Sequence, residues 1–182
     1  DESVIPLISK YNHSFKKSIY FIHLIGQHPV YNQRYPEQFK RFNKNDYSTT
    51  YTDEQRINLA HYDNATYYND YVINAIIEEF KEKESIVIYM PDHGQDIYET
   101  NPQYCGHGIN NNPQSFNIGT QIPFFIYTSD LYKENNQKTI NRFKEIQNRD
   151  FNTDHIIYLV MDIAGYKFKN NDDVNYFSIL QE

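Results

Sequence analysis

The sequence is poor in cysteine, in long apolar runs and in basic residues, and each shortage excludes a class of protein. Cys105 is the one cysteine among 182 residues, which excludes an internal disulfide framework and a zinc site made of several cysteines. No apolar run approaches the ~18–20 residues of a membrane-spanning helix. No basic and apolar leader opens the chain. We therefore expect neither a membrane span nor a signal peptide within these residues.

The shortage of basic residues bears on the partner. Lys and Arg number 17 against 24 Asp and Glu, which gives a formal net charge of -7. Proteins that bind duplex nucleic acid usually present a basic face to the phosphates, so nucleic acid is not expected as a partner. The chain does have 39% hydrophobic residues, enough for a globular fold, and its length fits one domain of ~100–200 residues.

Apolar runs and capping residues predict an α/β order of elements. Residues 1–16 are interpreted as a leader or a short helix. Three apolar runs are predicted as strands: 18–25 and 85–90, both buried, and 122–128. Three segments are predicted as helices: 53–83, which begins with a Thr52–Gln55 capping box, 136–147, and 154–164, which Gly165 ends. This order favours α/β layers with at least partly parallel strands.

Three of the seven histidines lie in the long loops that follow the predicted strands, where α/β sheets gather their sites. His28 follows the first strand, and His93 and His107 follow the second. Asp92 and His93 offer a carboxylate and an imidazole at a strand end, a pair that suits zinc or manganese. The alternative is a polar turn without chemistry. His23, in the middle of a predicted strand, is interpreted as a core histidine.

An ordered set of motifs carries a family resemblance. The set is Ile22-His-Leu-Ile-Gly-Gln-His-Pro29, Tyr62-Asp-Asn64, Ile88-Tyr-Met-Pro-Asp-His-Gly94, His107-Gly108 and Ile122-Pro-Phe124. It resembles the C-terminal part of the periplasmic catalytic domain of bacterial phosphoethanolamine transferases, in the sulfatase-like branch of the alkaline phosphatase superfamily. The Tyr62-Asp-Asn64 motif is interpreted as a packing and loop-anchoring element.

The resemblance implies a fold and a location. The fold is a three-layer α/β/α sandwich with a mainly parallel sheet, of which residues 17–182 would be the C-terminal half. The parent protein would sit in the inner membrane, with this domain in the periplasm.

The resemblance also implies a reaction. Phosphoethanolamine passes from phosphatidylethanolamine to a threonine, and from there to lipid A or a lipopolysaccharide sugar. By motif position, Asp92 and His93 resemble the metal ligands, with zinc as the expected metal and manganese as the alternative. His28 and His107 resemble the two histidines that handle the phosphoryl group.

The chain departs from the family in ways that set further expectations. The family's glutamate ligand and threonine nucleophile come from an earlier part of the domain, and nothing before residue 17 matches them. We therefore expect a fragment that is inactive alone, and that self-associates or pairs with its missing N-terminal half. The alternatives are a sulfatase or phosphoglycerol transferase of the same superfamily, a non-catalytic metal-binding or anion-binding module, and a folded domain without a site.

Overall fold

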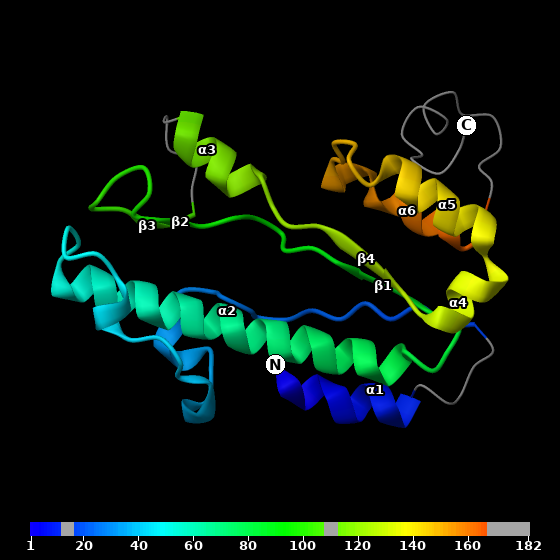
Figure 1. The fold of residues 1–182 in the computed structure, drawn as a ribbon, viewed down its shortest axis with the longest axis horizontal. Helices are drawn as coiled ribbons and strands as arrows, with labels where there is room; N and C mark the ends of the chain where they lie inside the picture. The colour runs from blue at the N-terminus through cyan, green and yellow to red at the C-terminus, as the bar shows by residue number, and fades with distance from the viewer. Residues whose placement is uncertain (12–16, 108–112, 167–182) are drawn as a thin grey trace. The chain divides into compact units, whose positions relative to one another are not determined.

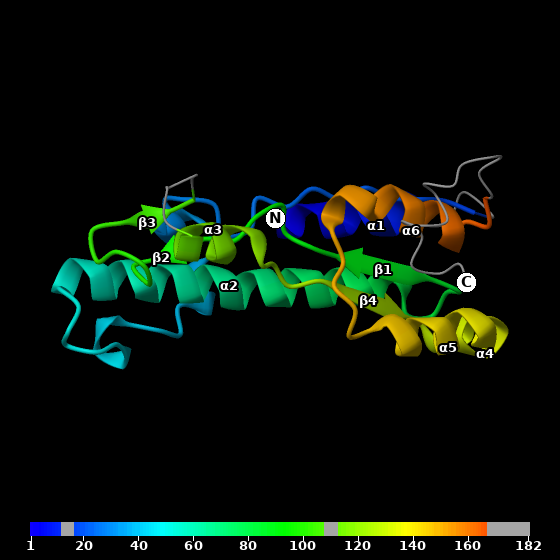
Figure 2. The same cartoon turned by 90° about the horizontal axis from the view of Figure 1, so that it is seen from above.

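The computed structural model describes residues 1–11, 17–107 and 113–166. The chain divides into two compact units, Asp1–Thr128 and Ser129–Glu182, and Figures 1 and 2 draw both from two directions. Among the described residues, no helix combines the length and the hydropathy that crossing a bilayer requires.

The first unit is built on one long helix, α2 (Asp53–Phe80). The Gln55 amide donates to the Thr52 hydroxyl at 3.2 Å, and the Thr52 amide donates to the Gln55 side chain at 2.8 Å. This capping box satisfies two amides near the start of the helix, so the helix begins where the sequence predicts. It ends at Phe80 rather than 83, because the Ser85 hydroxyl donates to the Phe80 carbonyl at 2.7 Å and turns the chain.

The core of this unit lies where α1 (Ile5–Tyr11) runs alongside the second half of α2 (Figures 1 and 2). Five buried side chains form it: Ile8, Tyr68, Val72, Ile76 and Phe80. The α2 members recur every four residues and so share one face of the helix. Burying one such apolar side chain stabilises a fold by about 1.5–3 kcal/mol. Of the two interpretations of residues 1–16, the short helix agrees with α1, which contributes Ile8 to the core.

Residues 18–25, predicted as a buried strand, are extended but pair with no described strand. Three side chains pack on the core cluster: Tyr20, Ile22 and Leu24. The alternate side chains are exposed: Ile19, Phe21, His23 and Ile25. The alternation is that of a β-strand, but a strand also needs the backbone of a neighbour to bond with. The prediction of a buried strand is therefore wrong for the side of the segment that faces outward. The prediction of a core histidine is wrong as well, because His23 lies on that exposed side.

Two antiparallel strand pairs lie among the described residues of this unit. β1 (Ile86–Tyr89) pairs with β4 (Phe125–Thr128), and β2 (Asp96–Ile97) pairs with β3 (Cys105–Gly106) in a short hairpin. The sequence predicts β1 and β4 but not the hairpin. The sequence also predicts parallel strands. Such a pair would form between residues 18–25 and β1, with α2 as the crossover that connects them. The described strands contain no such pair, because residues 18–25 pair with no described strand.

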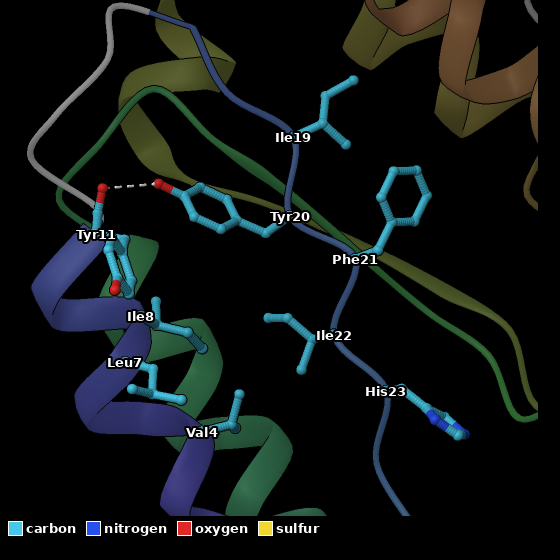
Figure 3. Close-up of a pocket in the computed structure, with 9 residues that line it drawn as sticks. All are labelled: Val4, Leu7, Ile8, Tyr11, Ile19, Tyr20, Phe21, Ile22 and His23. Atoms are coloured by element: carbon cyan, nitrogen blue, oxygen red, sulfur yellow. Dashed lines mark hydrogen bonds between the residues drawn. The ribbon is translucent and has the colours of Figure 1, made fainter.

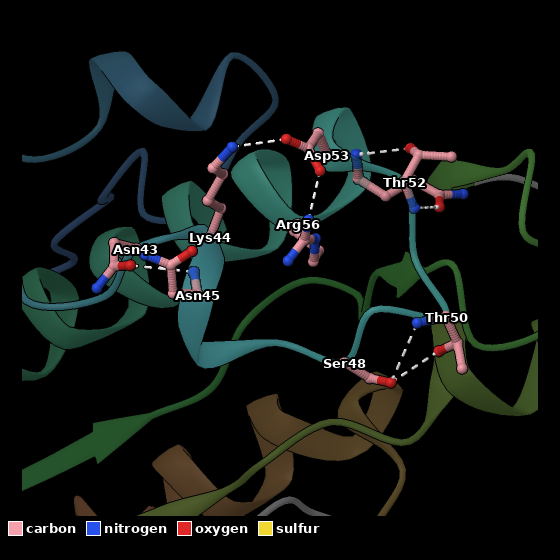
Figure 4. A network of polar contacts seen from close by, with 9 residues as sticks. Asn43, Lys44, Asn45, Ser48, Thr50, Thr52, Asp53 and Arg56 are labelled. Carbon is pink, nitrogen blue, oxygen red and sulfur yellow. Dashed lines mark hydrogen bonds and ion pairs between the residues drawn. The ribbon is translucent and has the colours of Figure 1, made fainter.

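The loop that precedes α2 is fixed to the start of the helix by polar contacts, which Figure 4 shows. Lys44 Nζ lies 2.6 Å from Asp53 Oδ2, and Asp53 also pairs with Arg56. Within the loop, Asn43 Oδ1 accepts from the Asn45 amide at 3.0 Å. Lys44 and Asp53 are exposed, so solvent screens their ion pair and it contributes little to stability. The loop therefore needs a second, buried anchor.

Asn64 of α2 is that buried anchor. Its side chain is 1% exposed. Its Oδ1 accepts from the amides of Arg41 and Phe42 at 2.7 and 2.8 Å, and its Nδ2 donates to the Phe42 carbonyl at 2.9 Å. Asp63 accepts from the Tyr47 hydroxyl at 2.5 Å. The geometry confirms that the Tyr62-Asp-Asn64 motif anchors a loop.

The second unit contains three α-helices among its described residues, α4 (Asp130–Asn135), α5 (Gln137–Ile146) and α6 (Ile156–Ile163), and a 3-10 turn at Thr153–His155. Buried Ile140, Ile146 and Leu159 show the apolar faces of α5 and α6. After α6, Gly165 takes a φ of +78° and its amide donates to the Asp162 carbonyl at 3.0 Å. A left-handed glycine commonly ends a helix, so the prediction at Gly165 is confirmed.

Candidate functional site

The Asp92-His93-Gly94 turn follows β1 after Met90 and Pro91, close to the strand end as predicted. The Gly94 amide donates to the Gly119 carbonyl of α3 (Pro113–Thr120) at 2.9 Å. A Cβ atom at Gly94 would overlap the carbonyl oxygen of Ile118. The glycine of this motif is therefore required because the α3 backbone approaches so closely.

Asp92 and His93 lie at the surface with their polar atoms close together. Asp92 Oδ1 accepts from the His93 amide at 3.0 Å and lies 3.8 Å from His93 Nε2. The Asp92 side chain is 88% exposed and that of His93 is 35% exposed. His93 Nδ1 lies 2.9 Å from the Gly94 carbonyl oxygen. Because a carbonyl only accepts, this contact places the proton of a neutral His93 on Nδ1 and leaves Nε2 to bind a metal.

The β2–β3 hairpin brings His107 to His93. Asp96 lies opposite Gly106 in the hairpin, so the chain after β3 returns toward the Asp92–Gly94 turn. The rings of His93 and His107 lie 4.0 Å apart between centroids, at an angle of 31°. The structure thus brings together three of the four predicted site residues.

His28 stands apart from these three side chains. It is exposed, and its amide donates to the Ile25 carbonyl at 3.3 Å. Among the described residues, no hydrogen bond or ring contact joins its imidazole to Asp92, His93 or His107. The role of His28 therefore stays a prediction.

The described residues supply only part of a metal site. No group of three or more His, Cys, Asp and Glu side chains is arranged to hold a metal ion in the described parts of the chain. Catalytic zinc usually has three protein ligands. Asp92 and His93 fit zinc by the chemistry of their donor atoms, but they provide two ligands at most.

Sequence reasoning missed a buried carboxylate, Asp96, which holds the hairpin. It is 2% exposed and accepts from the amides of Glu99 and Thr100 at 3.0 and 3.3 Å, and from the Thr100 hydroxyl. Burial alone would raise the pKa of Asp96, but these hydrogen bonds lower it. An aspartate with a threonine four residues on is typical of a side-chain-capped turn, which was the available signal. By closing this turn, Asp96 helps to place His107.

Comparison with known proteins assigns the chain to a family. A family model described as Sulfatase matches residues 1–166. The chain belongs to the sulfatase family. This confirms the family resemblance that the motifs carry.

Curated relatives within the sulfatase family are phosphoethanolamine transferases. EptC of Escherichia coli K12 is 28% identical over 171 residues, which cover 92% of this chain and 29% of that protein. EptA of Helicobacter pylori is 32% identical over 143 residues, which cover 74% of this chain and 26% of that protein. The chain thus spans less than a third of the length of these relatives.

Solved structures agree on the fold. The C-terminal periplasmic domain of E. coli EptC is 27% identical, with a TM-score of 0.74 over 87% of this chain and 44% of that one. A zinc complex of that domain is 25% identical, with a TM-score of 0.75 over 98% and 49%. A Neisseria meningitidis relative at 19% identity shares the fold, with a TM-score of 0.71 over 98% and 55%. The α/β sulfatase fold is therefore confirmed, and the chain spans about half of each solved domain.

Proposed function

We propose that residues 17–182 form the C-terminal half of the periplasmic catalytic domain of an inner-membrane phosphoethanolamine transferase. The observation that carries this proposal is the cluster of Asp92, His93 and His107 after β1, in a chain similar to phosphoethanolamine transferases over most of its length. The solved neighbours from E. coli are periplasmic domains, which supports the location.

The proposed reaction moves phosphoethanolamine from phosphatidylethanolamine to lipid A or a lipopolysaccharide sugar. A relative from E. coli K12, 32% identical over 121 residues, is named a Kdo(2)-lipid A phosphoethanolamine 7''-transferase. The names of the relatives favour this reaction over sulfate-ester hydrolysis. The threonine nucleophile would lie outside residues 1–182.

The site residues have distinct proposed roles. Asp92 and His93 hold zinc, which neutralises phosphoryl charge and activates the nucleophile when bound. His107, whose ring lies against that of His93, contacts the phosphoryl oxygens, and His28 donates a proton to the leaving oxygen. The zinc complex of the EptC domain supports the choice of metal.

Activity of the full-length protein tests these roles. Transfer from phosphatidylethanolamine is followed by the mass that lipid A gains. We expect Asp92→Asn and His93→Ala to lower the rate at least ~100-fold, because each removes a ligand that stabilises transition-state charge. Asp70→Asn, an exposed carboxylate on α2, is the matched control and should leave the rate unchanged. Hydrolysis of a nitrophenyl sulfate without phosphoethanolamine transfer would instead identify a sulfatase.

The 182-residue chain alone should bind zinc weakly and turn over no substrate, because the described residues supply at most two ligands. Calorimetric titration with zinc measures this directly. Tight, stoichiometric binding by a monomer would contradict the proposed division of the ligands.

The exposed face of residues 18–25 is the proposed contact with the rest of the domain. A hollow of about 330 Å³ lies between this segment and α1. In Figure 3, Tyr20 and Ile22 point toward α1, whereas Phe21 points away. Phe21 is 89% exposed, and an unpaired extended segment with an apolar face favours pairing with another chain.

Self-association of the isolated chain tests this contact. Light scattering should show oligomers, and Phe21→Asp should shift them toward monomer because it places a charge on the contact face. Ser18→Asp, next to the apolar positions, controls for added charge. A wild-type chain that stays monomeric at high concentration would count against the contact.

A further inference from the structure

Three consecutive backbone carbonyls around His28 accept hydrogen bonds from side chains. Gln95 Nε2 donates to the Gln27 carbonyl at 3.1 Å. Arg34 Nε donates to the His28 carbonyl and Arg34 Nη2 to the Pro29 carbonyl, both at 2.9 Å. Arg34 belongs to the same loop as His28, whereas Gln95 lies two residues after His93. Of these two donors, Gln95 is therefore the one that links the His28 loop to the Asp92–Gly94 turn.

The amide of Gln95 is oriented from its other end by Tyr31. The Tyr31 hydroxyl donates to Gln95 Oε1 at 2.7 Å. Tyr31 is 4% exposed, and its ring meets Tyr62 of α2 edge-on at 5.3 Å. Burial, and then the Cys105 thiol nearby, raise the pKa of Tyr31, so the hydroxyl keeps its proton and remains a donor. Because the Gln27 carbonyl only accepts, the nitrogen of Gln95 must face it.

The backbone between these contacts is strained. Val30 has a φ of +67° and a ψ of +55°, a left-handed conformation that a β-branched residue rarely adopts. Such conformations persist where the surroundings hold them, and they cluster at functional sites. Val30 lies between Pro29, which Arg34 holds, and Tyr31, which bonds to Gln95. The contacts around Val30 therefore hold the His28 loop in one conformation.

We propose that Gln95 is a positioning residue that sets the exposed imidazole of His28 relative to the Asp92–His93 turn. The catalytic meaning of this role rests on the function proposed above, because it requires His28 to act on the phosphoryl group. The structural part, that Gln95 fixes the His28 loop, stands independently of the reaction.

Two variants remove the link in different ways. Gln95→Glu keeps the size of the side chain but replaces the N–H donor with an oxygen that repels the Gln27 carbonyl. Tyr31→Phe keeps the buried ring and removes only the hydroxyl that orients Gln95, so it tests the link even if Gln95→Glu fails to fold. Gln33→Glu makes the same charge change at an exposed glutamine of the same loop and is the control.

The imidazole resonances of His28 in the 182-residue chain provide the first readout, which requires no activity. We expect both test variants to shift or broaden them, and Gln33→Glu to leave them unchanged. Unchanged His28 resonances in Gln95→Glu and Tyr31→Phe would overturn the proposal, whatever the protein catalyses.

The rate of phosphoethanolamine transfer by the full-length protein provides the second readout. We expect Gln95→Glu to lower kcat ~10- to 100-fold, because small displacements of a reacting group cost this much. KM should stay within about twofold, since the substrate contacts themselves are kept. Shifted resonances with an unchanged kcat would overturn the positioning role. A wild-type protein without transferase activity would instead refute the proposed function and leave the resonance test of Gln95 standing.

Discussion

The two long loops of the first unit are held in opposite ways. Residues 26–52 are fixed by buried side chains of α2, of which Asn64 binds two amides and one carbonyl. The Asp92–Gly94 turn leaves its functional groups open, with the Asp92 side chain 88% exposed, and is held through its own backbone against α3. The first loop is positioned by side chains, whereas the Asp92–Gly94 turn is positioned by a glycine that permits close approach of the α3 backbone.

Because the two loops are held differently, one loop makes the contacts that stabilise the fold and the other presents the residues available for chemistry. A buried amide that satisfies three backbone groups is costly to lose, so Asn64 should dominate the stability of the unit. An exposed carboxylate and imidazole contribute little to folding and remain available to a metal or substrate. Variants in the two loops should therefore differ in which property they change.

The largest expected effect is that of Asn64→Ala, which removes the buried anchor of the first loop. Two amides and a carbonyl of Arg41 and Phe42 lose their partner, so we expect a loss of about 3 kcal/mol in the free energy of unfolding. Urea denaturation of the 182-residue chain measures it. Asn74→Ala, at an exposed position of α2, should change stability by less than about 0.5 kcal/mol. Equal effects of the two variants would show that Asn64 is not the anchor.

Local signals in the sequence predicted the elements they control directly. The Thr52–Gln55 capping box and Gly165 both act on backbone within a few residues, and both predictions are confirmed. Residues 18–25 have the alternating pattern of a strand. A strand also needs a neighbouring strand to bond with, and the pattern of one segment does not reveal whether such a neighbour is present. His23 was misassigned for the same reason, because its face is buried only if such a partner covers it.

The candidate site was predicted in part. Asp92 and His93 are adjacent in sequence, so their proximity is guaranteed by the chain. The ring contact between His107 and His93 depends on a hairpin whose strands have two residues each, too short for periodicity to reveal. Gln95 acts through contacts with Gln27 and Tyr31 that only the folded chain creates, whereas the turn at Asp96 had a local signal in Thr100.

A smaller effect is expected from Gly94→Ala, which tests the backbone contact of the second loop. The added Cβ would overlap the Ile118 carbonyl, so the turn or α3 must shift, at a cost of about 2 kcal/mol. Gly119→Ala, in α3 with no atom near its Cβ position, should instead stabilise the chain by roughly 0.5–1 kcal/mol. Thermal or urea unfolding compares the two. A neutral Gly94→Ala would mean that the turn is not held by close approach.

The smallest expected effect is a pH dependence of the free energy of unfolding that arises where residues 26–52 contact His61 of α2. His61 of α2 has its Nδ1 2.7 Å from the Tyr35 hydroxyl, and burial followed by the charge of Lys40 lowers its pKa. Below pH ~6.5 the unfolded chain therefore takes up a proton at this histidine more readily than the folded chain. Stability should fall as the pH drops through that value and level off once the folded His61 also protonates.

The urea midpoint between pH 8 and pH 5 measures this fall, and His61→Gln should remove that part of it. The substitution keeps a polar group beside Tyr35 but cannot titrate in this range. Wild type and His61→Gln with parallel pH profiles would show that His61 is as easily protonated in the folded chain as in the unfolded one. The contact with Tyr35 would then hold the loop without favouring the neutral imidazole.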